Sequence, residues 1–217
     1  MLGVVVTSSS PAVAARCAWA RAGVGAVATQ NITDPSLGPQ VLDVIGAGRS
    51  AADALDQVVA AMRHAAFRQL GVIDSDGRTA AYSGTRTLGL HASMAGADCI
   101  AAGNLLADQG VPAAMVSAFE RSSRDHLADR LLDALRAGEA AGGEEGPVRS
   151  CGLLVVGEVA WPITDLRVDW HVDPISELAQ LWEIWRPLEH DYLLRATDPA
   201  AAPSYGVPGE QRSRSGN

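Results

Sequence analysis

Apolar positions follow two different periods along this chain, and the two periods predict different elements. Segments that are β-branched or alternate between apolar and polar residues predict strands at 4–7, 25–31, 70–73, 79–82, 98–103, 151–156 and 165–170. Apolar residues at helical spacing predict helices at about 50–62, 112–122 and 125–137, and a last helix that includes Ile175 to Trp185. No regular strand–helix–strand repeat appears, so the pattern favours an α+β fold with helices packed on paired sheets.

The strand at 25–31 presents two different faces. Its alternation places Thr29 and Asn31 beside Val27. The other face carries Ala26, Ala28 and Gln30. We expect Thr29 and Asn31 to form a wall that binds an amide, although ordinary polarity at a sheet edge explains them equally well.

Four local signals mark where elements begin and end. Ser50, three residues before Asp53, is typical of a helix N-cap. Asp76-Gly77 predicts the tip of a hairpin, and Gly138 predicts the end of the helix at 125–137. From Asp198 the chain is rich in Ala, Pro, Ser and Gly. We therefore expect one domain over 1–197 and a flexible tail over 198–217.

The composition is that of one globular domain, with 47% hydrophobic and 19% charged residues among 217. No apolar run reaches the roughly 18 residues of a membrane span, and the start lacks a signal peptide, so we expect a cytoplasmic protein that contacts no membrane. The net charge of −8 argues against nucleic acid as a partner. All 17 basic residues are arginine, which excludes a catalytic lysine.

The three cysteines, Cys17, Cys99 and Cys151, are widely spaced. They form no CxxC pair, so the spacing predicts neither a zinc site nor a disulfide framework. We expect small buried side chains, no catalytic metal and no organic cofactor.

Several segments together resemble the bacterial domain-of-unknown-function family 1028, which is placed in the N-terminal-nucleophile (Ntn) hydrolase superfamily. The matching segments lie at 9–19, 21–30, 34–39, 71–74, 102–106, 138–143 and 165–169. The resemblance implies an αββα four-layer sandwich. It also implies a mature chain whose first residue, Thr, Ser or Cys, attacks an amide carbonyl while the free α-amino group acts as the base.

The chain departs from that family pattern at its start. Similar proteins usually begin about a dozen residues earlier, with an extra strand that opens on Met-Thr, whereas this sequence opens on Met1-Leu2. We expect the first strand of the sandwich to be missing, so that the strand at 4–7 lies at an exposed edge or takes a neighbour from another chain. A form extended upstream would carry the nucleophile.

The resemblance implies a cofactor-independent hydrolase of a small amide or peptide-like C–N bond. The alternative is a catalytically inactive binding or assembly module that keeps the fold and lacks the nucleophile. In both cases the partner is a small amide or peptide-like ligand.

The candidate catalytic residues are Thr7, Ser8, Ser9 and Asn104. The three hydroxyls follow the first strand, where they either line a cleft or end the strand and cap a turn. Asn104 follows Gly103, where it either donates to an oxyanion or occupies a left-handed turn.

The candidate binding residues, besides Thr29 and Asn31, are His91, Arg167 and Asp169. His91 is a ligand contact or an ordinary structural histidine. Arg167 stands between Asp165 and Asp169 on one strand face, which indicates either an ion-pair ladder or recognition of a substrate carboxylate.

An apolar cluster near the C-terminus predicts a homo-oligomer, most simply a dimer. Its members are Leu181, Trp182, Trp185 and Leu188.

Overall fold

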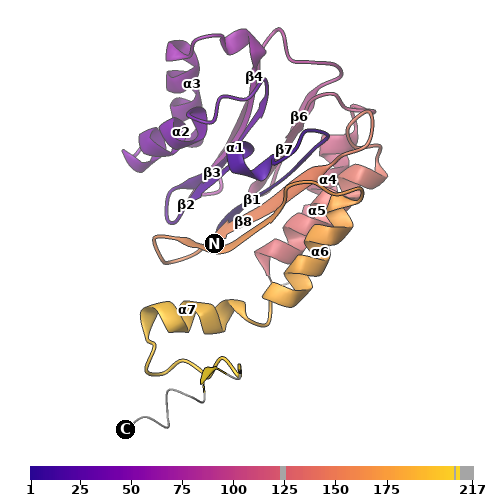
Figure 1. Ribbon diagram of the computed structural model, residues 1–217. Coiled ribbons are helices and arrows are strands. Elements are labelled where there is room, and N and C mark those ends of the chain that lie inside the picture. The colour runs from indigo at the N-terminus through magenta and orange to yellow at the C-terminus, as the bar shows by residue number, and fades with distance from the viewer. Residues whose placement is uncertain (123–125, 208, 211–217) are drawn as a thin grey trace. The chain divides into compact units, whose positions relative to one another are not determined.

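The computed structural model describes residues 1–122, 126–207 and 209–210. The chain divides into two compact units, Met1–Trp182 and Glu183–Asn217, and each is described by itself. The fold is mixed α+β with antiparallel sheets, as the sequence pattern predicts, and the described residues form seven α-helices (Figure 1). None of the helices in those residues is long and apolar enough to cross a membrane.

A four-stranded antiparallel sheet is built early in the first unit. Its strands are β2 (Ala18–Arg21), β3 (Gly25–Asn31), β4 (Arg68–Asp74) and β5 (Thr79–Ser83), in that order. Helices α2 (Leu37–Gly46) and α3 (Ala51–Ala61) cover one face, where Leu55, Val27 and Val72 belong to one buried core cluster. Burial of these branched side chains stabilises the layer.

The remaining strands form two smaller sheets. The first has the order β1 (Leu2–Ser8), β8 (Ser150–Val156) and β9 (Pro162–Val168). The second pairs β6 (Ala92–Gly96) with β7 (Cys99–Gly103). Among the described residues β1 therefore lies at a sheet edge, one of the two arrangements expected for the strand at 4–7.

The two smaller sheets pack between the same neighbouring layers, a pair of helices on one side and the four-stranded sheet on the other. Helix α4 (Val111–Arg121) packs on β6 and β7, and α5 (Leu127–Ala140) packs on β1 and β8. On the other side, β1 contacts β2 and β3, and β7 contacts β4. The smaller sheets thus lie between the α4–α5 helix pair and the four-stranded sheet.

The helix cap and the hairpin turn lie where the sequence predicts them, whereas the prediction for Gly138 is wrong. Ser50 Oγ accepts a hydrogen bond from Asp53 N at 3.2 Å and caps α3, and Gly77, with φ of +81°, forms the predicted hairpin turn. Gly138 does not end its helix, because α5 continues to Ala140. A Cβ on Gly138 would lie 2.8 Å from Met115, so this glycine allows α4 and α5 to approach.

The sequence pattern does not reveal β2, β6, α2, the short helix α1 (Ala14–Cys17) or the helix at Glu189–Thr197. The strand predicted at 165–170 ends at Val168, so Asp169 lies beyond it. The remaining elements of the first unit are α1 (Ala14–Cys17), a 3₁₀ turn (Ala65–Phe67) and α6 (Pro174–Trp185), whose last residues enter the second unit.

Trp182 does not belong to an exposed apolar cluster, contrary to the basis for the dimer prediction. It is 1% exposed, and its indole N–H donates to Asp129 Oδ1 at 2.9 Å within the first unit. Two other members of the cluster on which the dimer prediction rests, Trp185 and Leu188, belong to the second unit.

The second unit contains α7 (Glu189–Thr197). The Arg195 guanidinium lies over both Tyr192 and Tyr205, at 4.9 and 4.0 Å from the ring centroids. Of the tail predicted over 198–217, residues 208 and 211–217 lie outside the described residues.

Candidate functional site

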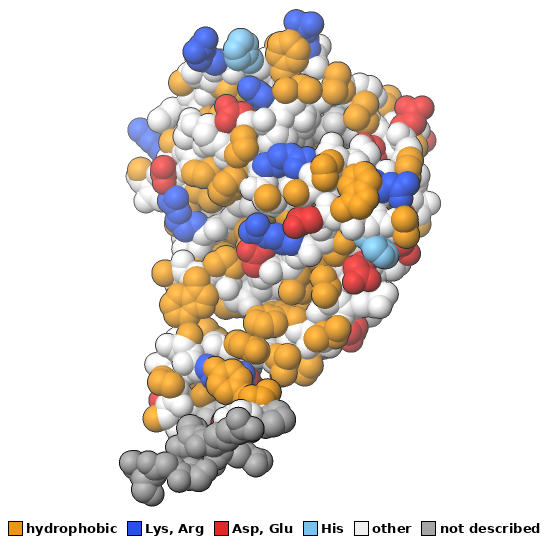
Figure 2. Space-filling model, in the orientation of Figure 1, with side chains coloured by type: hydrophobic (Ala, Val, Ile, Leu, Met, Phe, Trp, Pro, Cys, Tyr) orange, Lys and Arg blue, Asp and Glu red, His pale blue; other side chains and the backbone are white. Residues whose placement is uncertain are grey.

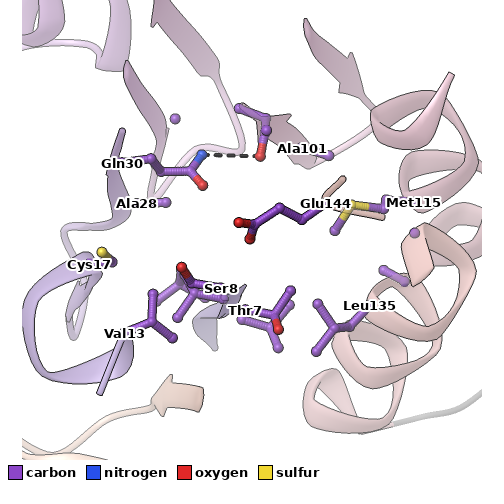
Figure 3. Close-up of a pocket in the computed structure, with 18 of the residues that line it drawn as sticks. Thr7, Ser8, Val13, Cys17, Ala28, Gln30, Ala101, Met115, Leu135 and Glu144 are labelled. Carbon is purple, nitrogen blue, oxygen red and sulfur yellow. Dashed lines mark hydrogen bonds between the residues drawn. The ribbon is translucent and has the colours of Figure 1, made fainter. Parts of the chain in front are cut away.

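A pocket of about 850 Å³ opens between β1, β3, β7 and the helices α4 and α5 (Figure 3). It is lined by consecutive residues of β1 and β7, by most residues of β3, by apolar side chains of α4 and α5, and by the loop after α5. The volume of the pocket is within the range found for sites that bind small molecules. All of its lining residues belong to the first unit.

The three predicted hydroxyls, Thr7, Ser8 and Ser9, line this pocket where β1 ends. The Thr7 hydroxyl donates to the Ser150 carbonyl at 3.0 Å. The Ser8 hydroxyl accepts from Ser10 N at 3.0 Å, as in a serine turn. Both bonds are those of a strand end, which was the structural alternative for these residues.

Ser9 has a different partner, the carboxylate of Glu144. The Ser9 hydroxyl donates to Glu144 Oε1, and Ser9 N donates to Oε2 at 3.0 Å. Glu144 extends into the pocket between the β1 hydroxyls and Gln30 (Figure 3). Gly142 and Gly143, with φ of +118° and +60°, turn the chain after α5 and so position this carboxylate.

Two amide side chains lie at the wall formed by β3 and β7. Gln30 Nε2 donates to the Ala102 carbonyl at 3.0 Å (Figure 3). Asn104 lines the pocket, and its Nδ2 donates at 3.2 Å to Gln69 Oε1. Gln69 is fully buried and donates to Gly103 O at 3.0 Å, so it anchors β7 to the four-stranded sheet. A ligand can therefore meet amide groups held in fixed positions.

Thr29 does not form part of the pocket wall, contrary to prediction. It is 1% exposed, lies on the same face as Val27, and donates to Arg16 O at 3.0 Å. Asn31 does line the pocket, but its φ of +68° and its bonds to Phe67 O and Leu88 N give it a turn-forming role. The pocket face of β3 carries Ala26, Ala28 and Gln30.

The other three predicted binding residues lie outside the pocket lining. His91 is exposed, with its Nδ1 3.2 Å from Gly89 O. Arg167 makes two 2.8 Å bonds to Asp165, whose carboxylate raises the arginine pKa. Asp169 is exposed beyond β9. The ion-pair interpretation therefore fits Arg167. The backbone carbonyl of Asp169 accepts a hydrogen bond from Ala12 N at 2.9 Å, so this residue helps to hold the turn after β1.

Cys17 and Cys99 line the pocket, and burial raises the pKa of both thiols. Thiols with raised pKa values stay protonated at neutral pH and are weak nucleophiles. Burial raises the pKa of Cys151, which lies outside the pocket, to about 12. The described residues contain no group of three or more His, Cys, Asp or Glu side chains arranged to hold a metal ion.

The charged groups of the pocket are mostly acidic. Asp98, Glu139, Glu144 and Asp173 line it, together with Arg16. Arg16 donates to the carbonyls of Pro11 and Ala12, which hold it at the turn after β1. The Met1 α-amine is also at the pocket, but Met1 is separated from Thr7 by most of β1, a span of about 20 Å at the usual strand rise.

Figure 2 shows basic and acidic side chains interspersed on the face that it presents.

Comparisons with known proteins agree on one family. The family model described as "Family of unknown function (DUF1028)" matches residues 1–178. The crystal structure of protein SPO2555 from Silicibacter pomeroyi, assigned to the same family, superposes with a TM-score of 0.81 at 30% sequence identity. That match covers 88% of this chain and 83% of the other. No curated protein matches the sequence.

Proposed function

The chain belongs to the DUF1028 family, and on that basis we propose that its pocket binds a peptide-like ligand through the ligand's amide groups. The observation that carries this proposal is the convergence of Gln30, Asn104 and Glu144 on one partly apolar pocket. Amide and carboxylate side chains donate to and accept from a peptide group, and the apolar walls exclude water around those bonds.

We favour binding over cleavage because, in the part of the chain that the structure describes, no imidazole or amine bonds to the hydroxyls of Thr7, Ser8 or Ser9. Thr7 and Ser8 bond to backbone groups, and Ser9 bonds to a carboxylate. Activation of a hydroxyl ordinarily requires an imidazole or amine within hydrogen-bond reach. This supports the binding module that was the alternative expectation from the sequence.

Amide hydrolysis is the second candidate, and one observation favours it. The Ser9 hydroxyl donates a hydrogen bond to the Glu144 carboxylate, and both side chains border the pocket. A carboxylate that takes the serine proton would make Ser9 the nucleophile. In this case Ser9→Ala and Glu144→Gln would each abolish turnover without unfolding the protein.

We infer also that the fold is a variant of the Ntn sandwich. What supports this is the order of the layers: helices α2 and α3, the four-stranded sheet, the two smaller sheets, then helices α4 and α5.

The proposed function predicts binding of short capped peptides without cleavage. A series of acetylated tripeptide amides should raise the Tm in proportion to the logarithm of ligand concentration, and mass spectrometry should recover the peptides intact. Gln30→Leu and Asn104→Leu should each weaken binding, whereas His91→Ala, outside the pocket, serves as the matched control. Absence of any Tm shift would contradict binding, and cleavage that Ser9→Ala removes would favour hydrolysis instead.

A further inference from the structure

The outer edge of the four-stranded sheet at β5 carries no feature that blocks pairing with another strand. Strand β5 pairs with β4, and in the part of the chain that the structure describes no strand pairs with its other edge. Its five residues, Thr-Ala-Ala-Tyr-Ser, include no proline and no charge. Edges that stay unpaired are commonly blocked by charged side chains, proline or a bulge. The edge of β5 therefore resembles that of a strand that takes a partner.

The edges of β9 and β2 provide a contrast within the same chain. Strand β9 begins at Pro162, exposes Asp165 and Arg167, and has an irregular register with β8. Strand β2 is four residues long and ends at the exposed Arg21. These features are the ones that keep natural sheets from pairing edge to edge. Strand β5 has none of them.

The backbone of β5 directs alternate residues toward this edge. Gly84, just after β5, donates its N–H to Arg68 O at the start of β4, at 2.9 Å. In an antiparallel ladder, residues that exchange hydrogen bonds with the neighbouring strand alternate with residues that do not. The even-numbered residues of β5 therefore bond to β4, and Thr79, Ala81 and Ser83 direct their N–H and C=O groups outward. Ala81 and Ser83 are also exposed.

We propose that β5 pairs with β5 of a second copy of this chain, antiparallel about a two-fold axis at Ala81. The inference goes beyond the proposed function, because no residue of β5 lines the pocket. The two-fold axis places Ala81 opposite the partner's Ala81, and Thr79 opposite the partner's Ser83. Each facing pair of these outward residues exchanges two backbone hydrogen bonds. The pairing joins two four-stranded sheets into one.

The charges that flank β5 favour a second copy as the partner. Asp76 lies five positions before Ala81, and Arg86 lies five positions after it. Both are exposed, so the two-fold pairing brings the turn that carries Asp76 beside the partner's Arg86. Arg78 is already bonded to Asp74 and Asp76, and residues 79–85 carry no charge. Opposite charges therefore meet at each end of an uncharged edge, which makes the edge complementary to itself.

The neighbouring layer leaves the surface beside this edge apolar. Strand β6 contacts β5, and it carries no charged residue. Its Met94 side chain is 44% exposed. On the other face of β5, Ala80 and Tyr82 pack against the core below α2 and α3. An apolar surface around paired strands is typical of the centre of a homodimer interface.

The first test is sedimentation of the full chain, which should be a dimer. Ala81→Pro removes the outward N–H of both copies at the axis. Proline is tolerated in an edge strand where its nitrogen faces away from the neighbouring strand, so the monomer should keep its fold. Loss of the two hydrogen bonds should raise the dissociation constant of the dimer about tenfold or more. Ala81→Thr, which keeps the N–H and suits a strand, is the matched control and should leave that constant unchanged.

Charge substitutions at the same position test the register. Because Ala81 faces itself across the axis, Ala81→Lys and Ala81→Glu should each be monomeric, since like charges then lie opposite each other. An equal mixture of the two variants should form a dimer with one copy of each. Native mass spectrometry separates this mixed dimer from the two parent chains.

Three results would overturn the proposal, and each leaves peptide binding by the pocket in place. The first is a wild-type chain that stays monomeric at every accessible concentration. The second is a dimer that Ala81→Pro does not weaken, or charge variants that dimerise as well alone as mixed, since the copies would then meet elsewhere. The third is slow hydrogen exchange of the Thr79 and Ser83 amides in the monomeric Ala81→Lys variant, because another segment of the same chain would then cover the edge.

Discussion

On the α2–α3 side of the four-stranded sheet β3 and β4 present large apolar side chains, whereas the opposite side includes small residues at its centre. Val27, Leu70 and Val72 fill the space below α2 and α3 and are at most 1% exposed. Ala28 and Gly71, on the other face of the same strands, border the pocket. Large side chains complete a core, and small ones leave room for something else.

The two sides also differ in how their polar groups are used. Asp74, at the end of β4, is 1% exposed and accepts hydrogen bonds from Ala51 N, Asp76 N and both the backbone and side chain of Arg78. Gln30 and Asn104 keep part of their hydrogen-bonding capacity toward the pocket. The comparison implies that polar residues beside the core hold the fold, whereas those at the pocket are available to a ligand.

Removal of the Asp74 carboxylate should give the largest loss of stability. Asp74→Ala leaves the buried Ala51 N–H at the start of α3 without its acceptor and breaks the hairpin bonds, so the free energy of unfolding should fall by about 3 kcal/mol. Asp76→Ala, at an exposed carboxylate in the same hairpin, should change it by less than about 0.5 kcal/mol. Urea denaturation measures both. Equal losses of unfolding free energy in the two variants would show that the stabilisation comes from the hairpin and not from the buried Asp74 carboxylate.

The same carboxylate predicts how stability depends on pH. Burial alone would raise the pKa of Asp74, but the hydrogen bonds from Ala51, Arg78 and Asp76 outweigh it and lower that pKa. Its stabilising contribution is therefore present above the unfolded pKa of about 3.9 and is lost as pH falls through the lower folded pKa. The difference in stability between the wild type and Asp74→Ala should narrow below pH of about 4. A difference that stays constant down to acid unfolding would contradict this assignment.

Gln69 and Gln30 test the same difference between polar residues that hold the fold and polar residues at the pocket, with smaller expected losses of stability. Gln69→Leu should cost about 2 kcal/mol, since Gln69 is fully buried and bonds to Ser83, Gly103 and Asn104. Gln30→Leu should cost less than about 1 kcal/mol, because its amide is only partly buried at the pocket. Thermal unfolding of both variants measures the difference. A larger cost for Gln30 would mean that the pocket wall is part of the core.

The sequence predicts the elements whose hydrophobic periodicity is strong. The alternation at 25–31 and the apolar run at 151–156 correspond to β3 and β8. Helix α2 is less evident because Pro39 and two glycines lie within it. Strand β6, Ala-Ser-Met-Ala-Gly, has three exposed residues and no alternation to reveal it.

The candidate site is only partly predictable from sequence. The hydroxyls of β1 and Asn104 were found because each follows a strand, and strand ends commonly border clefts. Periodicity separated the two faces of β3, but Thr29 drew attention to the wrong one, since the pocket lies over the small residues. Glu144 meets Ser9 across 135 positions of sequence, and no local pattern encodes that contact.

The central claim is that the pocket bordered by β1 and β7 binds a peptide-like ligand, and hydrogen exchange measures it most directly. Backbone amides of β1 and β7, which have one strand neighbour each among the described residues, should exchange faster than those of β3 and β4, which are paired on both sides. Addition of an acetylated tripeptide amide should slow exchange in β1 and β7, whereas exchange in β5 and β9, which do not line the pocket, should stay unchanged. Slow exchange in β1 and β7 without peptide, or protection confined to β5 or β9 on its addition, would contradict the account.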